Sequence, residues 1–314
     1  MIKIGIIGAG IMVKAHLDAI KKHNECKVVA IADIVEERAK QYAEVYGAHS
    51  FTDYHEMIGE CELDVVIINL PHYLHCEATC FFLKNGVNVF VEKPMAISIE
   101  ECDEMIKTAQ ENNKLLFIGH VQQYTDAHQY LKNVIKEEKY GKLLRLTEVR
   151  NTDYFTNRPA WFLDKKLSGG GIVMNYCAHT LDKVFYLTDS VLENACSVCT
   201  NNINNCTIEE GAQVLARLSN GVSAVFSYTG SSGPYYYENV FYFENGVVRV
   251  INSSDLFEFE NGDWKQIIKN EGKMHERAIA ELVKALKGEE SMITTMQHGR
   301  NVMEGIIKIY NCAL

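Results

Sequence analysis

The chain has 314 residues, of which 47% are hydrophobic and 23% are charged, so its composition is that of an ordinary globular protein with ample material for a core. At about 150 residues per domain, this length predicts two domains or one large one. The 31 Lys and Arg against 41 Asp and Glu give a net charge of −10, and no run of basic residues exceeds two. We therefore expect no binding to nucleic acids or to anionic membranes.

Ten cysteines raise the question of disulfide bonds. The chain opens directly into a strand-like segment with no signal peptide before it, and no apolar stretch approaches the roughly 20 residues that span a bilayer. We therefore expect reduced thiols, a cytoplasmic location and no membrane anchor. Cys196, Cys199 and Cys206 have a spacing that could begin a metal site, but no second pair or close His completes it. We expect them to be small buried hydrophobes, and we expect no metal.

The N-terminal part alternates short β-branched runs with longer amphipathic segments. Strands are expected at 2–7, 28–32, 65–69, 87–91 and 115–118, and helices at 15–22, 36–46, 75–85 and 98–112. Strand–helix alternation with continuously apolar strands predicts βαβ units and a parallel sheet that is buried on both faces.

The C-terminal part has a different pattern. After an expected helix at 125–138, polar and apolar residues alternate at 143–150, and helices are expected at 276–286 and 300–310. Asn-Gly pairs at 220–221, 245–246 and 261–262 lie between strand-like runs at 212–218, 224–228, 240–243 and 247–251, and Asn-Gly tolerates the positive φ of tight hairpin turns. We predict an α/β plus α+β fold, with a doubly wound parallel sheet in a first domain (1–121) and a largely antiparallel sheet with flanking helices in a second (122–314).

The segment Gly8-Ala9-Gly10-Ile11-Met12-Val13 follows the first expected strand and has the pattern of a dinucleotide-binding turn. The first glycine permits the bend, the second lets the backbone approach a pyrophosphate, and the helix N-terminus faces its charge. Asp33, at the end of the second strand, is placed to accept the ribose hydroxyls. Because this carboxylate would repel a 2′-phosphate and Ile34 and Val35 supply no cation, we expect NAD rather than NADP.

Glu92-Lys93-Pro94 follows the fourth expected strand. Ligands of doubly wound sheets bind beyond the carboxyl ends of the strands, and a lysine at the mouth of a buried sheet is costly without a purpose. We therefore interpret Lys93 as a functional residue that points to where a nicotinamide would lie.

Three glycines at 169–171 precede an expected helix that carries Asn175 and His179. The glycines predict a flexible backbone stretch, and residues four apart share one helical face. Oxidation of a secondary alcohol requires removal of the hydroxyl proton, a task that suits imidazole with its pKa near about 6.5. The alternative for His179 is a histidine of the core.

Together these motifs resemble the glucose–fructose oxidoreductase/inositol dehydrogenase (Gfo/Idh/MocA) family. The resemblance covers essentially the whole chain, including Asn69-Leu70-Pro71 with His75, Glu92-Lys93-Pro94, 119–124, 169–179 and 298–300. It implies a Rossmann domain that binds NAD(P), an open-faced sheet domain that often mediates oligomerisation, and oxidoreductase chemistry on sugars or cyclic polyols. It also implies that the lysine of Glu-Lys-Pro and a later Asp-x-x-x-His pair act on the reacting hydroxyl.

One position departs from the family pattern, because Asn175 stands where the family carries the carboxylate. An amide can hold a hydroxyl but cannot accept its proton, so we predict His179 as the base, Lys93 as the donor to the reacting oxygen and Asn175 as a substrate contact. Further candidate substrate contacts are His120, Gln122, Tyr124, Tyr154, Arg158 and Trp161. Candidate cofactor contacts are Gly8, Gly10, Ile11, Met12, Asp33, Asn69, Leu70, Pro71, His75, Glu92 and Lys93.

Some roles stay open at this point. Arg158 offers an anchor for a substrate carboxylate or phosphate, but a surface arginine is the more common interpretation, and Trp161 is equally a core residue. The leading hypothesis is an NAD-dependent dehydrogenase or reductase of a small-molecule sugar, sugar derivative or cyclic polyol, working as a homodimer or homotetramer through the C-terminal sheet. The alternatives are an NAD-dependent lyase or glycosidase that oxidises its substrate transiently, and a non-catalytic NAD-sensing regulator.

Overall fold

The structure is a computed structural model that describes residues 1–201, 206–230, 233–269, 271–292 and 294–313. The chain divides into two compact units. The first unit holds Met1–His120 and His275–Arg300, and the second holds Val121–Met274 and Asn301–Leu314.

The first unit is built on a six-stranded sheet in the order β3-β2-β1-β4-β5-β6, in which every pairing is parallel. Its strands are β1 (Ile2–Ile7), β2 (Cys26–Ala32), β3 (His49–Phe51), β4 (Val65–Ile68), β5 (Asn88–Val91) and β6 (Leu116–Ile118). This is the strand order of the Rossmann fold, so the predicted doubly wound sheet is confirmed. The short strand β3 is the element of this sheet that the sequence pattern did not predict.

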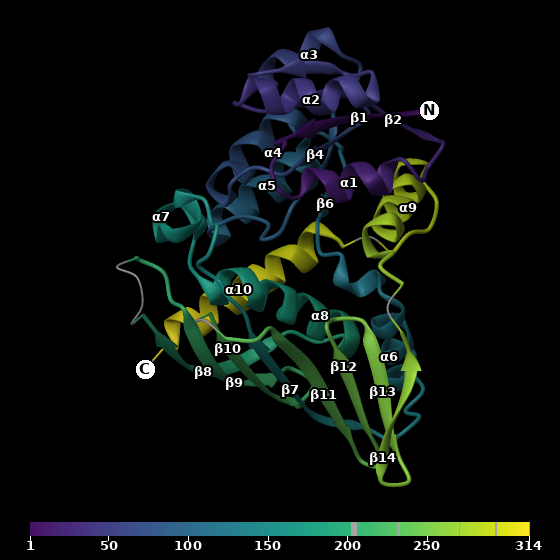
Figure 1. Cartoon of the computed structure of the whole chain (residues 1–314), viewed down its shortest axis with the longest axis vertical. Helices are drawn as coiled ribbons and strands as arrows, with labels where there is room; N and C mark the ends of the chain where they lie inside the picture. Colours follow the sequence, from purple (N-terminus) through teal and green to yellow (C-terminus); the bar gives the residue numbers. More distant parts are fainter. Residues whose placement is uncertain (202–205, 231–232, 270, 293, 314) are drawn as a thin grey trace. The chain divides into compact units, whose positions relative to one another are not determined.

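Helices alternate with these strands along the chain (Figure 1). They are α1 (Val13–Ile20), α2 (Glu36–Tyr46), α3 (Met57–Glu60), α4 (His75–Lys84) and α5 (Ile99–Glu111), with 3₁₀ turns at Tyr54–Glu56 and His72–Leu74. Ser98 begins α5 because its hydroxyl accepts a hydrogen bond from the backbone N–H of Glu101 at 3.2 Å, an N-cap that satisfies one of the unpaired first-turn amides.

Residues 275–300 belong to the first unit, whereas the sequence-based division places everything after residue 121 in the second domain. Helix α9 (Met274–Leu286) buries Ile279, Leu282 and Val283 in the same core cluster as strands β1, β2 and β4. Lys287, just after α9, also pairs with Glu25 before β2. An amphipathic pattern shows that a helix covers a core, but it does not show which core.

The second unit is built on an eight-stranded sheet in the order β14-β13-β12-β11-β7-β10-β9-β8. Its strands are β7 (Leu143–Asn151), β8 (Leu192–Thr200), β9 (Gly211–Leu218), β10 (Ser223–Thr229), β11 (Tyr236–Phe243), β12 (Val247–Ile251), β13 (Asp255–Glu260) and β14 (Asp263–Ile268). The pairing of β7 with β10 is parallel and the other pairings are antiparallel, so the predicted largely antiparallel sheet is confirmed.

The three Asn-Gly pairs each connect two antiparallel strands of this sheet, as predicted: β9 with β10, β11 with β12, and β13 with β14. Only Asn261 and Gly262 both have positive φ, at 53° and 84°. At the first pair, Gly221 alone is left-handed (φ 88°), and the Asn220 side chain accepts a hydrogen bond from the N–H of Val222. The dipeptide therefore marks each hairpin, but the turns differ in conformation.

One face of the second sheet is covered by helices (Figure 1). Helix α6 (Asp126–Lys136) is joined to α8 (Ala178–Thr188) by hydrogen bonds from Gln129 and Lys132 to Tyr186. Other segments are α7 (Lys165–Ser168), α10 (Met296–Asn311), a π-helix at Val173–Cys177, and 3₁₀ turns at Gln122–Tyr124 and Ala160–Leu163. The outer face leaves apolar side chains exposed, such as Leu215 at 60% and Val225 at 44%, so this sheet is open-faced.

All ten cysteines are free, and Cys196 and Cys199 lie on β8. Cys196 is exposed, and Cys199 and Cys206 are partly exposed, so the expectation that these three are buried is wrong. For the two cysteines on β8 the spacing gives a reason, because residues three apart on a strand point to opposite sides, so Cys196 and Cys199 cannot both face the core. Residues 202–205, which follow this strand, lie outside the described residues.

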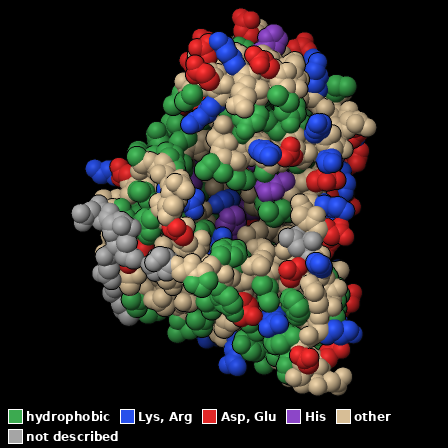
Figure 2. Space-filling view, viewed as in Figure 1, with side chains coloured by type: hydrophobic (Ala, Val, Ile, Leu, Met, Phe, Trp, Pro, Cys, Tyr) green, Lys and Arg blue, Asp and Glu red, His purple; other side chains and the backbone are tan. Residues whose placement is uncertain are grey.

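Acidic and basic side chains are interspersed over the face that Figure 2 shows. Within the described parts of the chain, no helix has both the length and the apolar character needed to cross a membrane.

Candidate functional site

The glycine turn after β1 has the backbone that a dinucleotide site requires. Gly8 has a φ of +89°, and a Cβ at this position would lie 2.7 Å from the carbonyl oxygen of Asn69, so no larger residue fits. A Cβ on Gly10 would meet no atom within 4 Å, which leaves room for a ligand to approach the backbone. Val13, at the third position of the motif, is fully buried in the core cluster.

The turn also fixes the carboxylate of Asp33. Its Oδ2 accepts a hydrogen bond from the N–H of Ala9 at 2.7 Å, and its Oδ1 accepts one from the N–H of Val35 at 2.8 Å. Each carboxylate oxygen can accept more than one hydrogen bond, so both keep capacity for the hydroxyls of a ribose. Asp33 thus lies next to the glycine turn with its orientation set by the backbone.

Exposed apolar side chains flank this turn. Ile11 is 80% exposed and Ile34 is 90% exposed, and Met12 at the start of α1 is 36% exposed. Large apolar side chains in such positions are typical of surfaces that a ligand covers.

The loop after β4 contributes a buried acceptor. The side-chain Nδ2 of Asn69 donates to the carbonyl of Gly8 at 3.4 Å, while its Oδ1 is buried and makes no hydrogen bond to any described residue. A buried acceptor without a donor is costly, so this atom fits a site that a ligand donor completes.

His75 holds two loops together. It is fully buried, with Nδ1 2.9 Å from the carbonyl oxygen of Pro94 and Nε2 2.9 Å from that of Leu70. Burial lowers the pKa of His75, which favours the neutral ring. A neutral ring has one N–H and donates to only one of these carbonyls at a time, but it contacts both the Asn69-Leu70-Pro71 loop and the Lys93-Pro94 loop.

Glu92 and Lys93 follow β5, at the same carboxyl edge of the sheet. The Glu92 carboxylate is buried, lies 2.7 Å from Nε2 of His16 in α1, and accepts the backbone N–H of Lys93 at 3.2 Å. Burial alone would raise the pKa of Glu92, but the hydrogen bond from His16 and the nearby Lys93 charge lower it to about 2. Glu92 is therefore ionised, and because it can then only accept, Nε2 of His16 carries the proton between them.

In the second unit, the glycines at 169–171 are tightly packed, so the prediction of a flexible stretch is wrong. Gly169 ends α7 with φ +82°, and Gly170 has φ +158°. A Cβ on Gly170 would overlap the hydroxyl of Tyr310, and one on Gly171 would overlap the backbone of Glu209. Gly170 and Gly171 need glycine for close approach rather than for mobility, and Gly169 has the left-handed backbone that glycine favours at a helix end.

Glu209 organises the start of the helix that follows these glycines. Its carboxylate accepts hydrogen bonds at 3.0 Å from the N–H groups of Gly171 and Val173, and Tyr310 donates its hydroxyl to it at 2.7 Å. A carboxylate at a helix N-terminus satisfies amides that have no partner inside the helix. Sequence reasoning missed Glu209 because it lies far along the chain from the motif it supports.

Asn175 lies within the π-helix Val173–Cys177, and His179 lies in the first turn of α8. A single turn of π-helix inside an α-helix is rare and is frequently found at functional sites. Asn175 is buried beside Tyr154, and His179 is partly exposed. The predicted regular helix is therefore interrupted between these two residues.

A buried ion pair fastens α8 to β7. Lys183 donates to Glu148 at 2.6 Å and to the hydroxyl of Tyr237 at 2.6 Å, and both charged side chains are fully buried. The hydroxyl of Thr180 donates to the other oxygen of Glu148 and accepts from Tyr228 at 2.8 Å. This network sets the position of the helix that carries His179.

Tyr154, Arg158 and Trp161 lie near one another in the second unit. Arg158 donates its Nε to the carbonyl of Tyr154 at 2.9 Å, and its guanidinium lies over the Tyr154 and Phe162 rings. Trp161 is partly exposed and packs edge-on against Phe162. Arg158 is thus partly engaged by its own loop.

The residues His120, Gln122 and Tyr124 are all buried. His120 is in the first unit, 6.2 Å from the ring of His298, while Gln122 and Tyr124 begin the second unit. The carbonyl of Gln122 lies 2.9 Å from Nδ1 of His128, and its side-chain Oε1 is buried without a hydrogen bond to a described residue.

Arg150 is a candidate that sequence reasoning missed. Its guanidinium lies 3.6 Å from the centre of the Tyr176 ring and 4.7 Å from that of Tyr237. Its Nε and Nη1 are buried and form no hydrogen bond within the described residues. Tyr176 follows Asn175 directly, so this cation lies beside the π-helix. The alternation of β7 predicts an inward-facing residue at 150 but not its aromatic neighbours.

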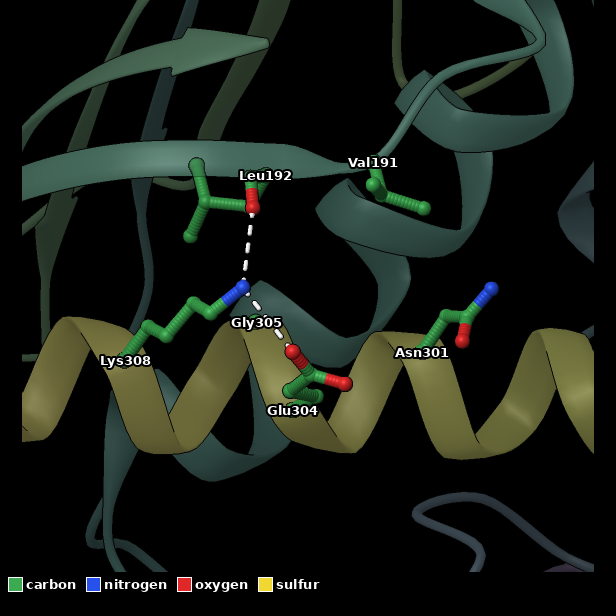
Figure 3. A pocket seen from close by; sticks show the side chains of 6 residues that line it. All are labelled: Val191, Leu192, Asn301, Glu304, Gly305 and Lys308. Atoms are coloured by element: carbon green, nitrogen blue, oxygen red, sulfur yellow. Dashed lines mark hydrogen bonds and ion pairs between the residues drawn. The ribbon is translucent and has the colours of Figure 1, made fainter. Parts of the chain in front are cut away.

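The structure thus groups the predicted residues by unit. Around the carboxyl edge of the first sheet it gathers the glycine turn, Asp33, Asn69 and Lys93, and around the π-helix it gathers Tyr154 and Asn175. A shallow pocket elsewhere in the second unit includes none of the predicted site residues, and its lysine is engaged by Glu304 and the carbonyl of Leu192 (Figure 3). That pocket is lined by Val191, Leu192, Asn301, Glu304, Gly305 and Lys308.

Comparison with known proteins agrees with this geometry. Residues 2–120 match the model of an oxidoreductase family with an NAD-binding Rossmann fold, and residues 128–249 match the Gfo/Idh/MocA C-terminal domain. A 2,7-anhydro-N-acetylneuraminate hydratase of Mediterraneibacter gnavus is 32% identical over 191 residues, which are 60% of this chain and 50% of that protein. A glucose-6-phosphate 3-dehydrogenase of Bacillus subtilis is 28% identical over 71% of this chain and 66% of its own length. The chain thus aligns with half to two thirds of these relatives.

A solved structure shows the same fold over the full length of the chain. The WlbA dehydrogenase of Bordetella pertussis, in complex with NADH and UDP-GlcNAcA, superposes with a TM-score of 0.88 over 99% of this chain and 96% of that one. The two are 22% identical, so this likeness is one of fold. Both family models match in chain order, as the sequence motifs predict, and the chain belongs to the Gfo/Idh/MocA family of NAD-binding oxidoreductases.

Proposed function

We propose that the protein is an NAD-dependent oxidoreductase that acts on a CH–OH group, or its carbonyl counterpart, of a sugar, sugar derivative or cyclic polyol. The observation that carries this proposal is the Asp33 carboxylate, held at 2.7 Å by the amide of Ala9 within the glycine turn. The relatives and the fold neighbour support the substrate class, since their names include a sugar phosphate dehydrogenase and a complex with a nucleotide sugar.

The residues of the first unit fit a dinucleotide. Gly10 leaves the turn open for the pyrophosphate, Asp33 would accept the ribose hydroxyls, and Asn69 offers a buried acceptor. Ile11 and Ile34 would cover the apolar parts of the adenosine. The bound nicotinamide would exchange a hydride with the substrate carbon.

We propose NAD rather than NADP as the cofactor. Both Asp33 oxygens are fixed by backbone amides, so the carboxylate cannot swing away from a 2′-phosphate without losing two hydrogen bonds. The 2′-phosphate of NADP would lie next to this fixed carboxylate, and two negative charges in contact repel each other. Dissociation constants for the two cofactors, measured by calorimetry, test this choice, and tighter binding of NADP would overturn it.

For proton handling we assign Lys93 as hydrogen-bond donor to the reacting oxygen and His179 as the group that takes the hydroxyl proton. Glu92 supports the first role, because its ionised carboxylate holds the backbone of Lys93. The network under α8 supports the second, because it fixes the helix on which His179 lies. Asn175 would orient a substrate hydroxyl by hydrogen bonds and cannot itself accept its proton.

We further propose that the substrate carries a carboxylate or a phosphate. Arg150 supports this, since two of its guanidinium nitrogens are buried without hydrogen bonds to described residues. A planar guanidinium that is stacked on Tyr176 and has two nitrogens without hydrogen bonds to described residues can donate to the oxygens of an anion. Arg158 is the weaker anchor, since its Nε is already bonded to Tyr154.

Turnover with NAD⁺ over a panel of neutral and acidic sugars and inositols, followed by NADH absorbance, tests the function. Acidic sugars should react best. Lys93→Met and His179→Ala should each lower kcat strongly while NAD affinity changes little for His179→Ala. Arg150→Met should raise KM for an acidic substrate, and Arg145→Met on the same strand is the matched control. Tight NAD binding with no turnover of any panel member would refute the proposal.

A hydratase or lyase is the second candidate function. One of the closely related proteins is named a hydratase, and Asn175 removes the carboxylate that the family pattern carries. Glycoside cleavage or water addition that requires NAD but yields no net NADH distinguishes this function from a dehydrogenase. A purely NAD-sensing protein would bind NAD and show neither activity.

We also propose that the outer face of the second sheet pairs with a second copy of the chain. Val149, Val198, Leu215 and Val225 are 41–60% exposed on four strands of this sheet that neighbour one another, β7, β8, β9 and β10. Light scattering on the wild type and on Leu215→Glu tests this, and a wild-type monomer would refute it.

The ten free thiols support the cytoplasm, a reducing compartment, as the proposed location of the protein.

A further inference from the structure

Two cysteines and a carboxylate meet between α4 and α5 in the first unit. Cys76 and Cys80 lie four residues apart on α4, and Glu104 lies on α5. Their sulfur and carboxylate oxygen atoms all lie within 4.8 Å of one another. Cys76 and Cys80 are buried, at 7% and 4% exposure, whereas Glu104 is exposed.

The geometry disfavours a disulfide. Residues four apart on a helix have Cβ atoms about 5–6 Å apart, whereas a disulfide requires about 3.5–4.5 Å. Both cysteines lie inside α4, so closing the gap would break the helix. The two sulfurs are thus held near each other without being able to bond.

The same spacing suits a tetrahedral cation. With Zn–S bonds of about 2.3 Å and Zn–O bonds of about 2.0 Å, neighbouring ligand atoms of a tetrahedron lie roughly 3.5–3.8 Å apart. The sulfur of Cys76 lies 3.8 Å from Oε2 of Glu104, and the remaining pairs fall within 4.8 Å. Small side-chain rotations would therefore complete three corners of the tetrahedron.

The surroundings are open and acidic. Glu104 lies at the solvent side, which gives an ion a path to the buried sulfurs and leaves a fourth corner for water. Glu101 and Glu104 are the charged groups near Cys76, and Lys84 lies near Cys80. Two carboxylates against one ammonium favour a cation.

We propose that Cys76, Cys80 and Glu104 form a binding site for Zn²⁺, with water as the fourth ligand. Two thiols bind as thiolates, so each ion that binds releases up to two protons. The ion would join α4 to α5. His75, the first residue of α4, lies between the carbonyls of Leu70 and Pro94, so the site lies directly behind the loops that flank the glycine turn.

The experiment uses the 314-residue chain in its reduced form with Zn²⁺, and with Cd²⁺ as a probe because thiolate–Cd²⁺ bonds absorb in the ultraviolet. We expect one equivalent of Zn²⁺ to bind and to raise the Tm, and one equivalent of Cd²⁺ to give the thiolate band. Cys80→Ser should abolish the band, and Glu104→Gln should weaken Zn²⁺ affinity at least about tenfold. Cys196 and Cys312 are the most exposed thiols of the chain, so Cys196→Ser/Cys312→Ser is the matched control and should bind as the wild type does.

Several outcomes would overturn the proposal. They are absence of stoichiometric binding in the wild type, unchanged binding in Cys80→Ser or Glu104→Gln, and loss of binding in the control variant. Because Glu104 is exposed, Glu104→Gln is expected to fold even if Cys80→Ser does not, and circular dichroism establishes this before titration.

Discussion

The buried pair of Lys183 and Glu148 yields a quantitative prediction. Both side chains are 0% exposed, and the ammonium lies 2.6 Å from the carboxylate and 2.6 Å from the hydroxyl of Tyr237. Lys183→Met removes the cation and leaves a buried carboxylate that retains hydrogen bonds only from hydroxyl groups. Breaking a buried pair in this way costs about 3–5 kcal/mol in the free energy of unfolding.

Removing both charges should cost less than removing one. In Glu148→Leu/Lys183→Met no uncompensated charge remains, although the hydroxyls of Thr180 and Tyr237 lose their acceptor. We therefore expect the double variant to be more stable than Lys183→Met, with a coupling free energy above about 2 kcal/mol.

Urea unfolding followed by circular dichroism measures Lys183→Met, Glu148→Leu and the double variant. Lys136→Met, at an exposed lysine of α6, is the control and should change stability by less than about 0.5 kcal/mol. If Lys183→Met costs less than about 1 kcal/mol, or if the two single substitutions simply add, then the pair does not fasten α8 and the reasoning is refuted.

Three further predictions concern the two candidate sites. Asp33→Ser should weaken NAD binding about 10- to 150-fold, because charge-assisted hydrogen bonds of about 1.5–3 kcal/mol are lost, and it should improve NADP binding. Dissociation constants measured by calorimetry that stay unchanged for both cofactors would contradict the role of Asp33 at the ribose. The pKa of Glu92 is lowered to about 2, so its ionised form stabilises the fold above pH 5. As the pH falls towards 2, the free energy of unfolding should decrease by about 3 kcal/mol. Glu92→Gln should reduce this pH dependence, and a pH curve for the variant that runs parallel to that of the wild type would contradict the prediction. Gly170→Ala should lower the Tm more than Gly262→Ala, because both glycines have positive φ but only Gly170 faces the Tyr310 hydroxyl, and equal Tm losses would rule out the packing argument.

The sequence predicts well wherever one local rule decides the structure. Helix α2 has the predicted bounds, and β1 does too, because each is a short amphipathic or apolar run that ends at a clear turn residue. The Asn-Gly dipeptides mark hairpins for the same reason, since the turn depends on two adjacent residues. The three-residue strand β3 is not predicted, because three residues are too few to show a period.

Local sequence rules do not predict interactions between segments that are far apart in the chain. Gly170 and Gly171 look flexible in the sequence, because the Tyr310 hydroxyl and the Glu209 backbone that exclude a larger residue there come from elsewhere in the chain. The π-helix at Asn175 follows from the same contacts, since Glu209 and Tyr310 take up the amides of Gly171, Val173 and Met174. Arg150 is found only once Tyr176 and Tyr237 are placed around it.

Each segment that carries a proposed catalytic group is held by a buried glutamate, and none of the sequence motifs shows this arrangement. Glu92 binds the backbone of Lys93, Glu209 binds the turn before Asn175, and Glu148 binds the helix that carries His179. Each of these carboxylates is buried, and a buried charge persists only where its hydrogen bonds and ion pairs offset the loss of water. Each therefore fixes one geometry of the segment that it touches, since any other arrangement would leave the charge unpaired. Neutral substitutions at these glutamates should accordingly alter kcat and its pH profile more than KM, although none of the three is proposed to touch the substrate.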